Sequence, residues 1–345
     1  MRFVRLSVVA SICLAAVLFT GLKVGDPPGV QMRSFADSFL GSLDEDQKKK
    51  AMMPYDSEKR TDWHFIPKDV RKGLAMRDMN DAQQTAALRL LRAALSESGY
   101  DKASKIMLLE GVIRELEGEK RRFERDPQKY FVTVFGTPSD TDPWALSIEG
   151  HHLSLNFSFR DGKVSDSTPQ FFAANPAVIK GESSGPLGKG TRVLRTEEQL
   201  AFNLIKSLGD ENKEKAILAD KAPKELRFAG EAQVKVGEPE GVKLGDLSEN
   251  NQKLLKRLIR AYTDAVPEEL AKKRRGLINK AGWENVHFAW SGATKPGIGH
   301  YYRIRGESFL IEFVNRQADA AGNPANHIHC VWRDITGDFD LPNDQ

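Results

Sequence analysis

The sequence predicts an α+β protein built from two pseudo-equivalent halves, each made of helices followed by an antiparallel β-meander, packed as one globular unit. Two observations predict this fold. Three blocks of similar residues recur in the same order along the 345-residue chain. After the helical blocks of each half, apolar residues alternate with polar ones between Gly and Pro turns, which is typical of antiparallel hairpins.

The composition is that of an ordinary globular protein. Hydrophobic residues make up 40% of the chain and charged residues 29%, which excludes low-complexity and collagen-like classes. The 51 Lys and Arg residues nearly balance the 48 Asp and Glu residues, for a net charge of +3. A dedicated nucleic-acid-binding protein normally has a strong basic excess, so we expect no nucleic-acid partner.

Residues 1–24 have the pattern of a secretory signal peptide. Arg2 and Arg5 precede an uncharged, mostly apolar run over residues 6–22. This run is close to the shortest length that can span a bilayer and no clear cleavage site follows it, so an uncleaved anchor is the alternative. We therefore expect an exported protein, periplasmic or extracellular, that contacts a membrane only through this segment if the segment is retained.

The helical blocks come first in each half. Residues 42–51 and 207–216 each open a helix with acidic side chains in its first turn. Residues 73–93 match residues 241–261 with identical spacing. The apolar residues of the last segment follow a helical stripe that would face a core: Leu254, Leu255, Leu258, Ile259 and Tyr262. Chance similarity between amphipathic helices is the alternative to a duplication.

The strand blocks follow the helices. Three segments of the first half align without a gap with three segments of the second: 131–135, 144–148 and 153–157 with 287–291, 300–304 and 309–313. The predicted halves are 34–180 and 196–340, and a connector rich in Gly and Ser joins them over 181–195. A site is expected between the halves, because pockets form preferentially at such interfaces.

The alternation of side chains along a strand predicts which histidines share a face. Alternate side chains of a strand share a face, so His327 and His329 would point the same way. Such a pair can bind one metal ion if a third ligand approaches, and His152, His300 or Glu312 could supply it. The predicted metal ligands are His152, His300, His327 and His329. Because imidazole suits Zn, Cu and Fe alike, the metal is predicted only as a divalent transition metal.

Neighbouring polar residues complete the predicted site. Glu312 would handle proton transfer and Arg333 the charge of a substrate, while Asp334 would orient an imidazole or contact the substrate. The remaining predicted binding residues are His151, Asn156, Arg303 and Trp332. Two alternatives stay open: a polar pocket without a metal, and histidines that only hydrogen-bond backbone carbonyls and buried carboxylates.

Two further segments have structural interpretations. Cys13 lies in the signal segment, which leaves Cys330 as the single cysteine of a cleaved chain. Parity places Cys330 opposite His329, beside Ile328, so we expect it to be a small buried hydrophobe. The Trp63-His64-Phe65 segment is expected to tether a loop to the core.

The blocks that carry these residues resemble the bacterial DUF3500 family. The resemblance rests on EGHHLSLN at 149–156, HFAWSG at 287–292, HYYRI at 300–304, FLIEF at 309–313 and NHIHCVWRD at 326–334. It covers most of the chain after residue 24. The family label denotes unknown function, so the resemblance implies an exported protein with these histidine blocks as characteristic segments, and no reaction.

These observations favour an exported protein with a His-rich pocket between two duplicated halves, as in a metal-dependent hydrolase or oxidoreductase. Its small-molecule substrate or ligand is not identified by the sequence. The alternatives are a non-catalytic exported protein that binds a small ligand or a metal, and an envelope-associated structural protein.

Overall fold

The fold is described from a computed structural model for residues 25–120 and 122–343. The predicted signal segment, residues 1–24, lies outside this range. None of the helices in the described ranges is both long and apolar enough to cross a membrane.

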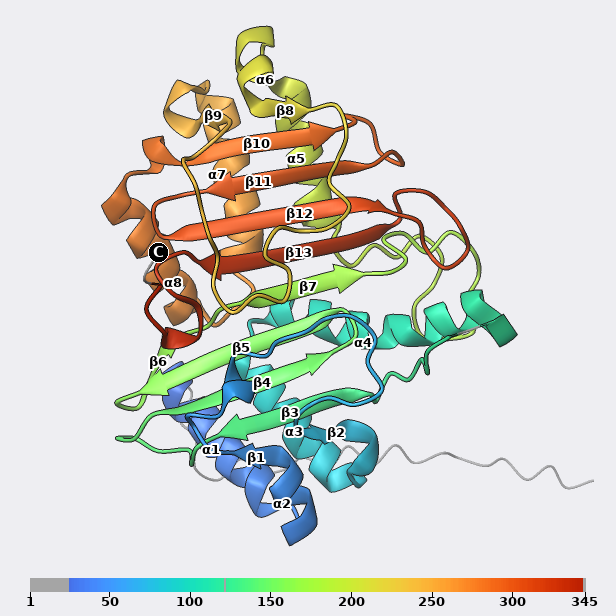
Figure 1. Cartoon of the computed structure of the whole chain (residues 1–345), viewed down its shortest axis with the longest axis vertical. Helices are drawn as coiled ribbons and strands as arrows, with labels where there is room; N and C mark the ends of the chain where they lie inside the picture. The colour runs from blue at the N-terminus through green and yellow to red at the C-terminus, as the bar shows by residue number, and fades with distance from the viewer. Residues whose placement is uncertain (1–24, 121, 344–345) are drawn as a thin grey trace, which may run out of the picture.

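All thirteen strands in the described ranges belong to one mostly antiparallel sheet (Figure 1). The first half contributes β1 (Met52–Met53), β2 (Leu74–Ala75), β3 (Tyr130–Phe135), β4 (Trp144–Gly150), β5 (Leu153–Arg160), β6 (Lys163–Asp166) and β7 (Gln170–Ala174). The second contributes β8 (Ile217–Ala219), β9 (Val242–Lys243), β10 (His287–Gly292), β11 (His300–Arg305), β12 (Phe309–Gln317) and β13 (His327–Asp334). The main path runs β1-β3-β4-β5-β7-β13-β12-β11-β10-β8.

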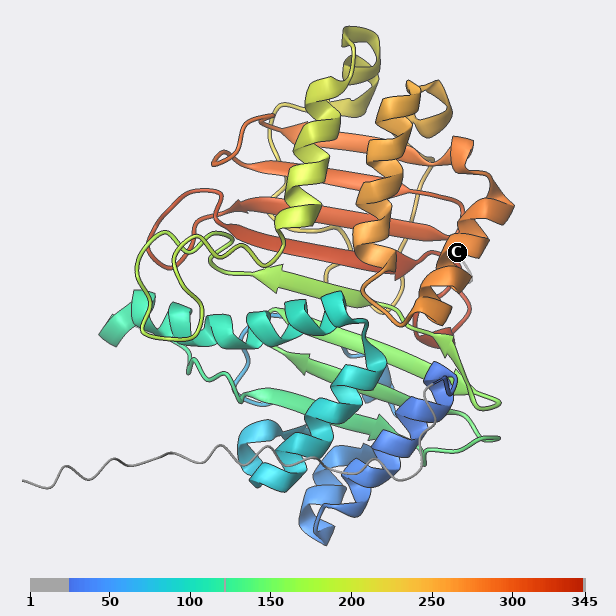
Figure 2. The same cartoon turned by 180° about the vertical axis from the view of Figure 1, so that it is seen from behind.

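The α-helices lie on one face of this sheet and at its two ends, as Figure 2 shows. In the described ranges they are α1 (Pro28–Gly41), α2 (Glu45–Ala51), α3 (Asp81–Ala94), α4 (Glu97–Glu117), α5 (Arg195–Ser207), α6 (Asp210–Ala216), α7 (Glu249–Thr263) and α8 (Glu268–Ala281). We call this side the helix face. Long irregular segments cross the opposite side, which we call the loop face (Figure 1).

Local sequence explains where the helices begin. The Asp44 carboxylate accepts hydrogen bonds from the first backbone N–H groups of α2, and Asn80 caps α3 in the same way, each completing a capping box. Ser248 caps α7 through the N–H of Asn251. The acidic starts predicted for residues 42–51 and 207–216 are therefore helix starts, in α2 and α6.

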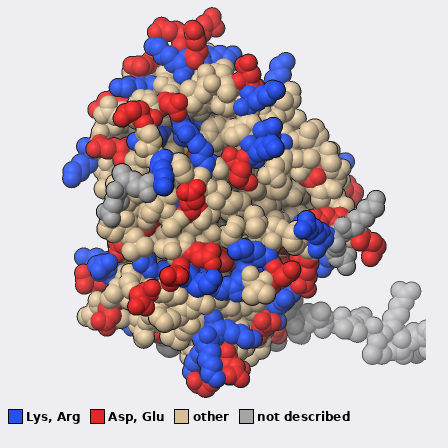
Figure 3. All heavy atoms as spheres, viewed as in Figure 1, with Lys and Arg blue, Asp and Glu red and all other residues tan. Residues whose placement is uncertain are grey.

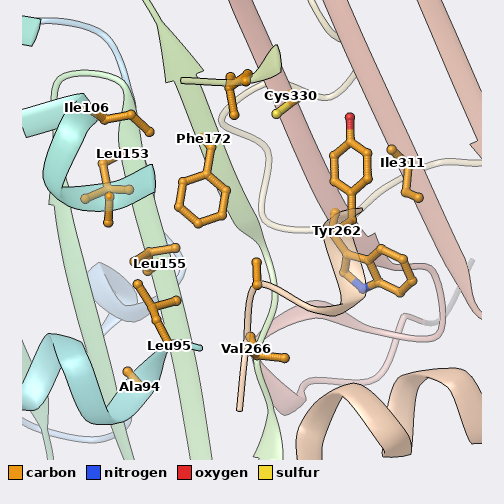
Figure 4. Close-up of a cluster of buried hydrophobic side chains, with 14 of the residues drawn as sticks. Ala94, Leu95, Ile106, Leu153, Leu155, Phe172, Tyr262, Val266, Ile311 and Cys330 are labelled. Atoms are coloured by element: carbon orange, nitrogen blue, oxygen red, sulfur yellow. The ribbon is translucent and has the colours of Figure 1, made fainter. Parts of the chain in front are cut away.

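The main hydrophobic core fills the space between the helices and the sheet. Figure 4 shows Leu153, Leu155 and Phe172 packed near Leu95 and Ile106. The same cluster continues to Tyr262, Ile311 and Cys330, so one core spans both halves. Cys330 is a free, buried thiol whose pKa is raised by burial, which confirms its predicted role as a small hydrophobe.

A smaller core lies on the loop face under two segments, residues 54–73 and 220–241. Trp63 and Phe65 from the first segment pack with Phe171 of β7. The Trp63 indole N–H donates to the carbonyl of Glu231 at 2.8 Å, which ties the two segments together. The predicted tether at residues 63–65 is confirmed.

The mixed α+β class is confirmed, and the predicted strand segments lie in β3, β4, β5, β10, β11 and β12. The sequence did not predict that β7 pairs with both β5 and β13, which joins the two meanders into one sheet. Residues 181–194 contain no helix or strand. That the halves are copies of one another stays a prediction.

Gly241 has a backbone that a larger residue cannot adopt easily. Its φ is +100°, and a Cβ atom there would lie 2.2 Å from the carbonyl oxygen of Phe288 on β10. We expect Gly241→Ala to lower the free energy of unfolding by about 2 kcal/mol or more, since strain and steric overlap add. Denaturant unfolding measures the change. Gly181→Ala is the matched control, because its added methyl group meets nothing within 4 Å. Equal stability of the two variants would contradict the prediction.

Candidate metal centre

Three histidines converge where the two halves meet. His152 lies in the turn between β4 and β5, and His327 and His329 lie on β13. The Nε2 atom of His327 is 2.9 Å from that of His152 and 3.0 Å from that of His329. One ligand atom from each residue fits within a group no wider than 4.8 Å. We call this group the histidine cluster.

The backbone around His152 explains how the turn reaches β13. His152 has a φ of +66°, a left-handed conformation that is uncommon outside glycine. Its N–H donates to the carbonyl of Phe65 at 2.8 Å, and its carbonyl accepts from the N–H of Ala173 at 2.9 Å. Because Ala173 pairs with His329 across β7 and β13, these bonds fix the His152 ring beside the other two.

Glu225 sets the proton position on His329. Both carboxylate oxygens of Glu225 lie 2.8 Å from His329 Nδ1. A proton on Nδ1 satisfies this carboxylate, so Nε2 is the ring nitrogen left to offer a lone pair. That lone pair faces the cluster, in the arrangement by which a second carboxylate commonly orients a metal-binding histidine.

The surroundings of the cluster favour neutral imidazoles. Burial lowers the pKa of His152 and of His327 well below the usual histidine range, and charge on the neighbouring rings lowers both further. The rings of Phe65 and Phe171 lie 5.1 and 5.7 Å from that of His329. Metal binding needs deprotonated imidazole nitrogens, and burial favours the neutral forms of His152 and His327.

Two of the three spacings within the cluster are close to those of a metal site. Nitrogen ligands about 2.0–2.1 Å from a tetrahedral ion are about 3.3 Å from one another. The observed separations of 2.9 and 3.0 Å are slightly shorter, so a small opening of the cluster would admit an ion. The three histidines could therefore hold a metal.

His151 supports the cluster without joining it. Its ring stacks on His152 with centroids 3.7 Å apart. Its Nδ1, however, faces the Glu110 carboxylate of α4 at 2.5 Å and Arg125 at 3.2 Å, on the helix face. The predicted binding residue His151 thus lies beside the cluster, with its Nδ1 already engaged by protein groups.

The structure does not bring His300 to the cluster. Its Nδ1 lies 2.9 Å from the carbonyl of Ile298, and its Nε2 lies 3.3 Å from Glu198 of α5. Its ring packs between Phe202 and Trp290, which places it on the helix face. Its inclusion among the predicted ligands is corrected for this reason.

Glu312 lies on the loop face but outside the cluster. It accepts a hydrogen bond from the Tyr301 hydroxyl, and its Oε1 is 3.5 Å from Nε of Arg227. Burial raises the pKa of its carboxyl group. Its predicted roles, third ligand and proton carrier at the histidines, have no geometric support, because Tyr301 and Arg227 are its partners.

Arg333 is a structural anchor of the loop face. Its Nε lies 2.5 Å from Asp338, and its other nitrogens donate to the carbonyls of Phe228, Glu231 and Ala232. These bonds hold segment 220–241 and the chain end against β13. The predicted contact of Arg333 with substrate charge stays a prediction, and the bonds seen in the structure are to the protein itself.

Trp332 and Asp334 also lie away from the histidines. The Trp332 ring stacks on Phe309 with centroids 4.7 Å apart, and the Asp334 carboxylate accepts from Thr336. Both line a narrow cavity of about 50 Å³ with Asp166 and other residues. Strand parity explains the separation, because both are odd-numbered steps from His327 and His329 along β13.

The last two predicted binding residues have other partners. The Asn156 amide donates to the carbonyl of Pro169 at 3.0 Å and to the Ser154 hydroxyl at 3.3 Å. Arg303 forms an ion pair with Glu240 at 2.6 Å and lines a separate cavity. Neither belongs to the histidine cluster.

No pattern in the sequence indicates Glu225. It lies in an irregular segment, where neither strand nor helix periodicity predicts the direction of a side chain. The one available signal is its position within a long polar stretch between two predicted elements, which is too general to select it.

The fold and the site together define an α+β protein with a buried three-histidine cluster that could hold a metal ion. The chain belongs to the DUF3500 family, described as a protein of unknown function, whose family model matches residues 27–341. The resemblance found in the sequence is thereby confirmed. No curated protein and no solved structure matches the chain.

The anchoring role of Arg333 can be tested by stability. Replacing one partner of a buried ion pair leaves the other charge uncompensated, so Arg333→Gln should lower the free energy of unfolding by about 3 kcal/mol or more. Arg160→Gln is the matched control, because Arg160 pairs with Asp340 and is 53% exposed. Exposed pairs contribute about 1 kcal/mol or less. Similar losses in both variants, by denaturant unfolding, would refute the anchor.

Asp166 makes stability depend on pH. Burial, with the negative charges of Asp338 and Asp334, raises its pKa from 3.8 to about 7. The folded state therefore binds a proton that the unfolded state releases, and this group's contribution to stability is lost as pH rises from about 4 to about 7. We expect Asp166→Asn to remove that part of the pH dependence in denaturant unfolding, whereas the exposed-site variant Asp220→Asn retains it. An unchanged profile for Asp166→Asn would contradict the assignment.

Proposed function

We propose that the protein binds one divalent transition-metal ion through the Nε2 atoms of His152, His327 and His329. The observation that carries the proposal is the convergence of three Nε2 atoms, with Glu225 directing the His329 lone pair into the group. Separations of 2.9 and 3.0 Å between Nε2 atoms also allow N–H···N hydrogen bonds, in which one ring carries the proton. A metal ion would replace such protons and bind all three nitrogens.

The ligand set favours zinc or copper over iron. Non-haem iron enzymes typically use two histidines and one carboxylate, whereas this group contains three histidines. Zinc bound by three histidines keeps a fourth position for water, whose pKa falls to about 7 on the metal. His327 is the partly exposed member of the group, so solvent would reach the ion from its side. On this basis we propose a metal-dependent hydrolase in preference to an oxidoreductase.

A non-catalytic metal-binding protein is the second candidate. Two carboxylates beside the cluster are already engaged, Glu225 with His329 and Glu110 with His151. In the described part of the chain neither is free to act as a general base beside the ion. Binding of azide to the cobalt-substituted protein separates the candidates, because an open coordination position changes the visible spectrum and a closed one does not.

We also infer that the protein is exported and that its halves arose by duplication. Export rests on residues 1–24, and N-terminal sequencing of the secreted protein tests it. Duplication is supported by matching pairings: β1 with β3 and β8 with β10 are both parallel. Gly73 and Gly241, equivalent in the two blocks, both have positive φ and abut the next meander. The cluster would then take His152 from one half and His327 and His329 from the other.

Metal content tests the proposed function. We expect wild-type protein, produced with zinc and copper supplied, to contain about one metal ion per chain by elemental analysis. His327→Ala and His329→Ala should lose it, because two histidines alone bind weakly. Glu225→Gln should weaken metal affinity about 10- to 100-fold, the usual effect of losing a carboxylate behind a histidine ligand.

His287→Ala is the matched control, since His287 bonds the backbone of Asn285 and lies outside the cluster. It should retain the metal. Wild-type protein that purifies without stoichiometric metal, and binds none on titration, would rule out the proposal.

A further inference from the structure

A second cavity opens on the loop face, separate from the histidine cluster. It has a volume of about 340 Å³ and lies between segment 220–241 and strands β11 and β12. Its basic residues are Arg227, Lys235, Arg303 and Arg305, and its apolar walls include Phe228 and Leu310. The volume lies within the range of small-ligand sites.

The cavity carries excess positive charge. Its four basic residues face two acidic ones, Glu238 and Glu240. Figure 3 shows basic and acidic side chains interspersed over this side of the molecule, so the excess belongs to the cavity and is not part of a broad basic surface. A cavity of this kind attracts a small anion more readily than a nucleic acid.

One of these arginines has a donor that the protein does not use, and another is almost fully buried. The Arg303 side chain is only 7% exposed, and its one ion pair in the described ranges is with Glu240. Arg305 donates to the carbonyl of Gly237 through Nη1, while its buried Nε has no hydrogen-bond partner. A buried, unpaired donor of a charged group costs stability unless a ligand or water satisfies it.

Acidic residues near these arginines offset part of their charge. Burial lowers the pKa of Arg305, the nearby Glu238 carboxylate raises it, and the Arg227 charge lowers it. Behind the cavity, Glu312 pairs with Arg227, and its Oε2 has no hydrogen-bond partner. Glu312 lies opposite Arg303 in the register of strands β11 and β12. An anion bound by these guanidinium groups would give the unpaired Nε of Arg305 an acceptor.

We propose that this cavity binds a small organic anion, whose carboxylate or phosphate group is held by Arg227, Arg303 and Arg305. The planar guanidinium fork matches both groups by paired hydrogen bonds. Phe228 and Leu310 contact the apolar part of the ligand. The site does not depend on the metal, because its residues come from β11, β12 and segment 220–241 and include none of the three histidines.

Calorimetric titration tests the proposal with two probes, inorganic phosphate and benzoate, each added to the full protein. We expect saturable binding of one probe per chain that weakens as NaCl is raised. Binding of benzoate alone assigns a carboxylate ligand, and binding of phosphate alone assigns a phosphorylated one. Arg303→Gln and Arg305→Gln should each weaken binding about tenfold or more, the effect of losing a charge-assisted hydrogen bond.

Three controls make the outcome decisive. Arg160→Gln removes an exposed arginine outside the cavity and should bind as wild type does. His327→Ala should also bind normally, which separates this site from the metal. Thermal melting checks folding, and Arg305→Gln carries the test if buried Arg303 proves essential for folding. Absence of saturable binding for both probes, wild-type affinity in Arg305→Gln, or loss of binding in His327→Ala would overturn the proposal.

Discussion

The pairing of β7 with two strands is the constraint on which the rest of the structure depends. β7 pairs with β5 on one side and with β13 on the other, so two meanders become one sheet over one core. The same strand places Ala173 between the His152 turn and His329, bonded to the first and paired with the second. Sheet continuity and the geometry of the histidine cluster therefore have the same cause.

On the loop face, two irregular segments cover a regular sheet. The strand register of the sheet fixes the positions of the histidines and arginines. The covers are segments 54–73 and 220–241. Hydrogen bonds from Trp63 and Arg333 clamp these covers in place. The covers contribute Glu225 to the cluster and Arg227 to the basic cavity. Functional groups on loops positioned by a rigid scaffold are common in proteins.

Strand parity accounts for what the sequence could predict. It placed His327 and His329 together and Cys330 on the opposite side, because side-chain direction in a strand depends only on spacing. His152 was also a predicted ligand, but its approach to β13 depends on a left-handed turn, and no pattern in the sequence reports that φ. His300 obeys parity too, but no pairing register was known, so its face could not be compared with that of β13. Glu225 and Arg227 lie in a segment whose sequence has neither helical nor strand periodicity, so the direction of their side chains could not be predicted.

The two ends of the sheet have a consequence for self-association. The main path ends in β1 and β8, strands of two and three residues, next to helices α2 and α6. Long exposed edge strands invite pairing with other chains, and very short ones offer too few backbone hydrogen bonds to stabilise it. Each end of this wide sheet therefore offers too few backbone hydrogen-bonding groups for a strand of another molecule to pair with it.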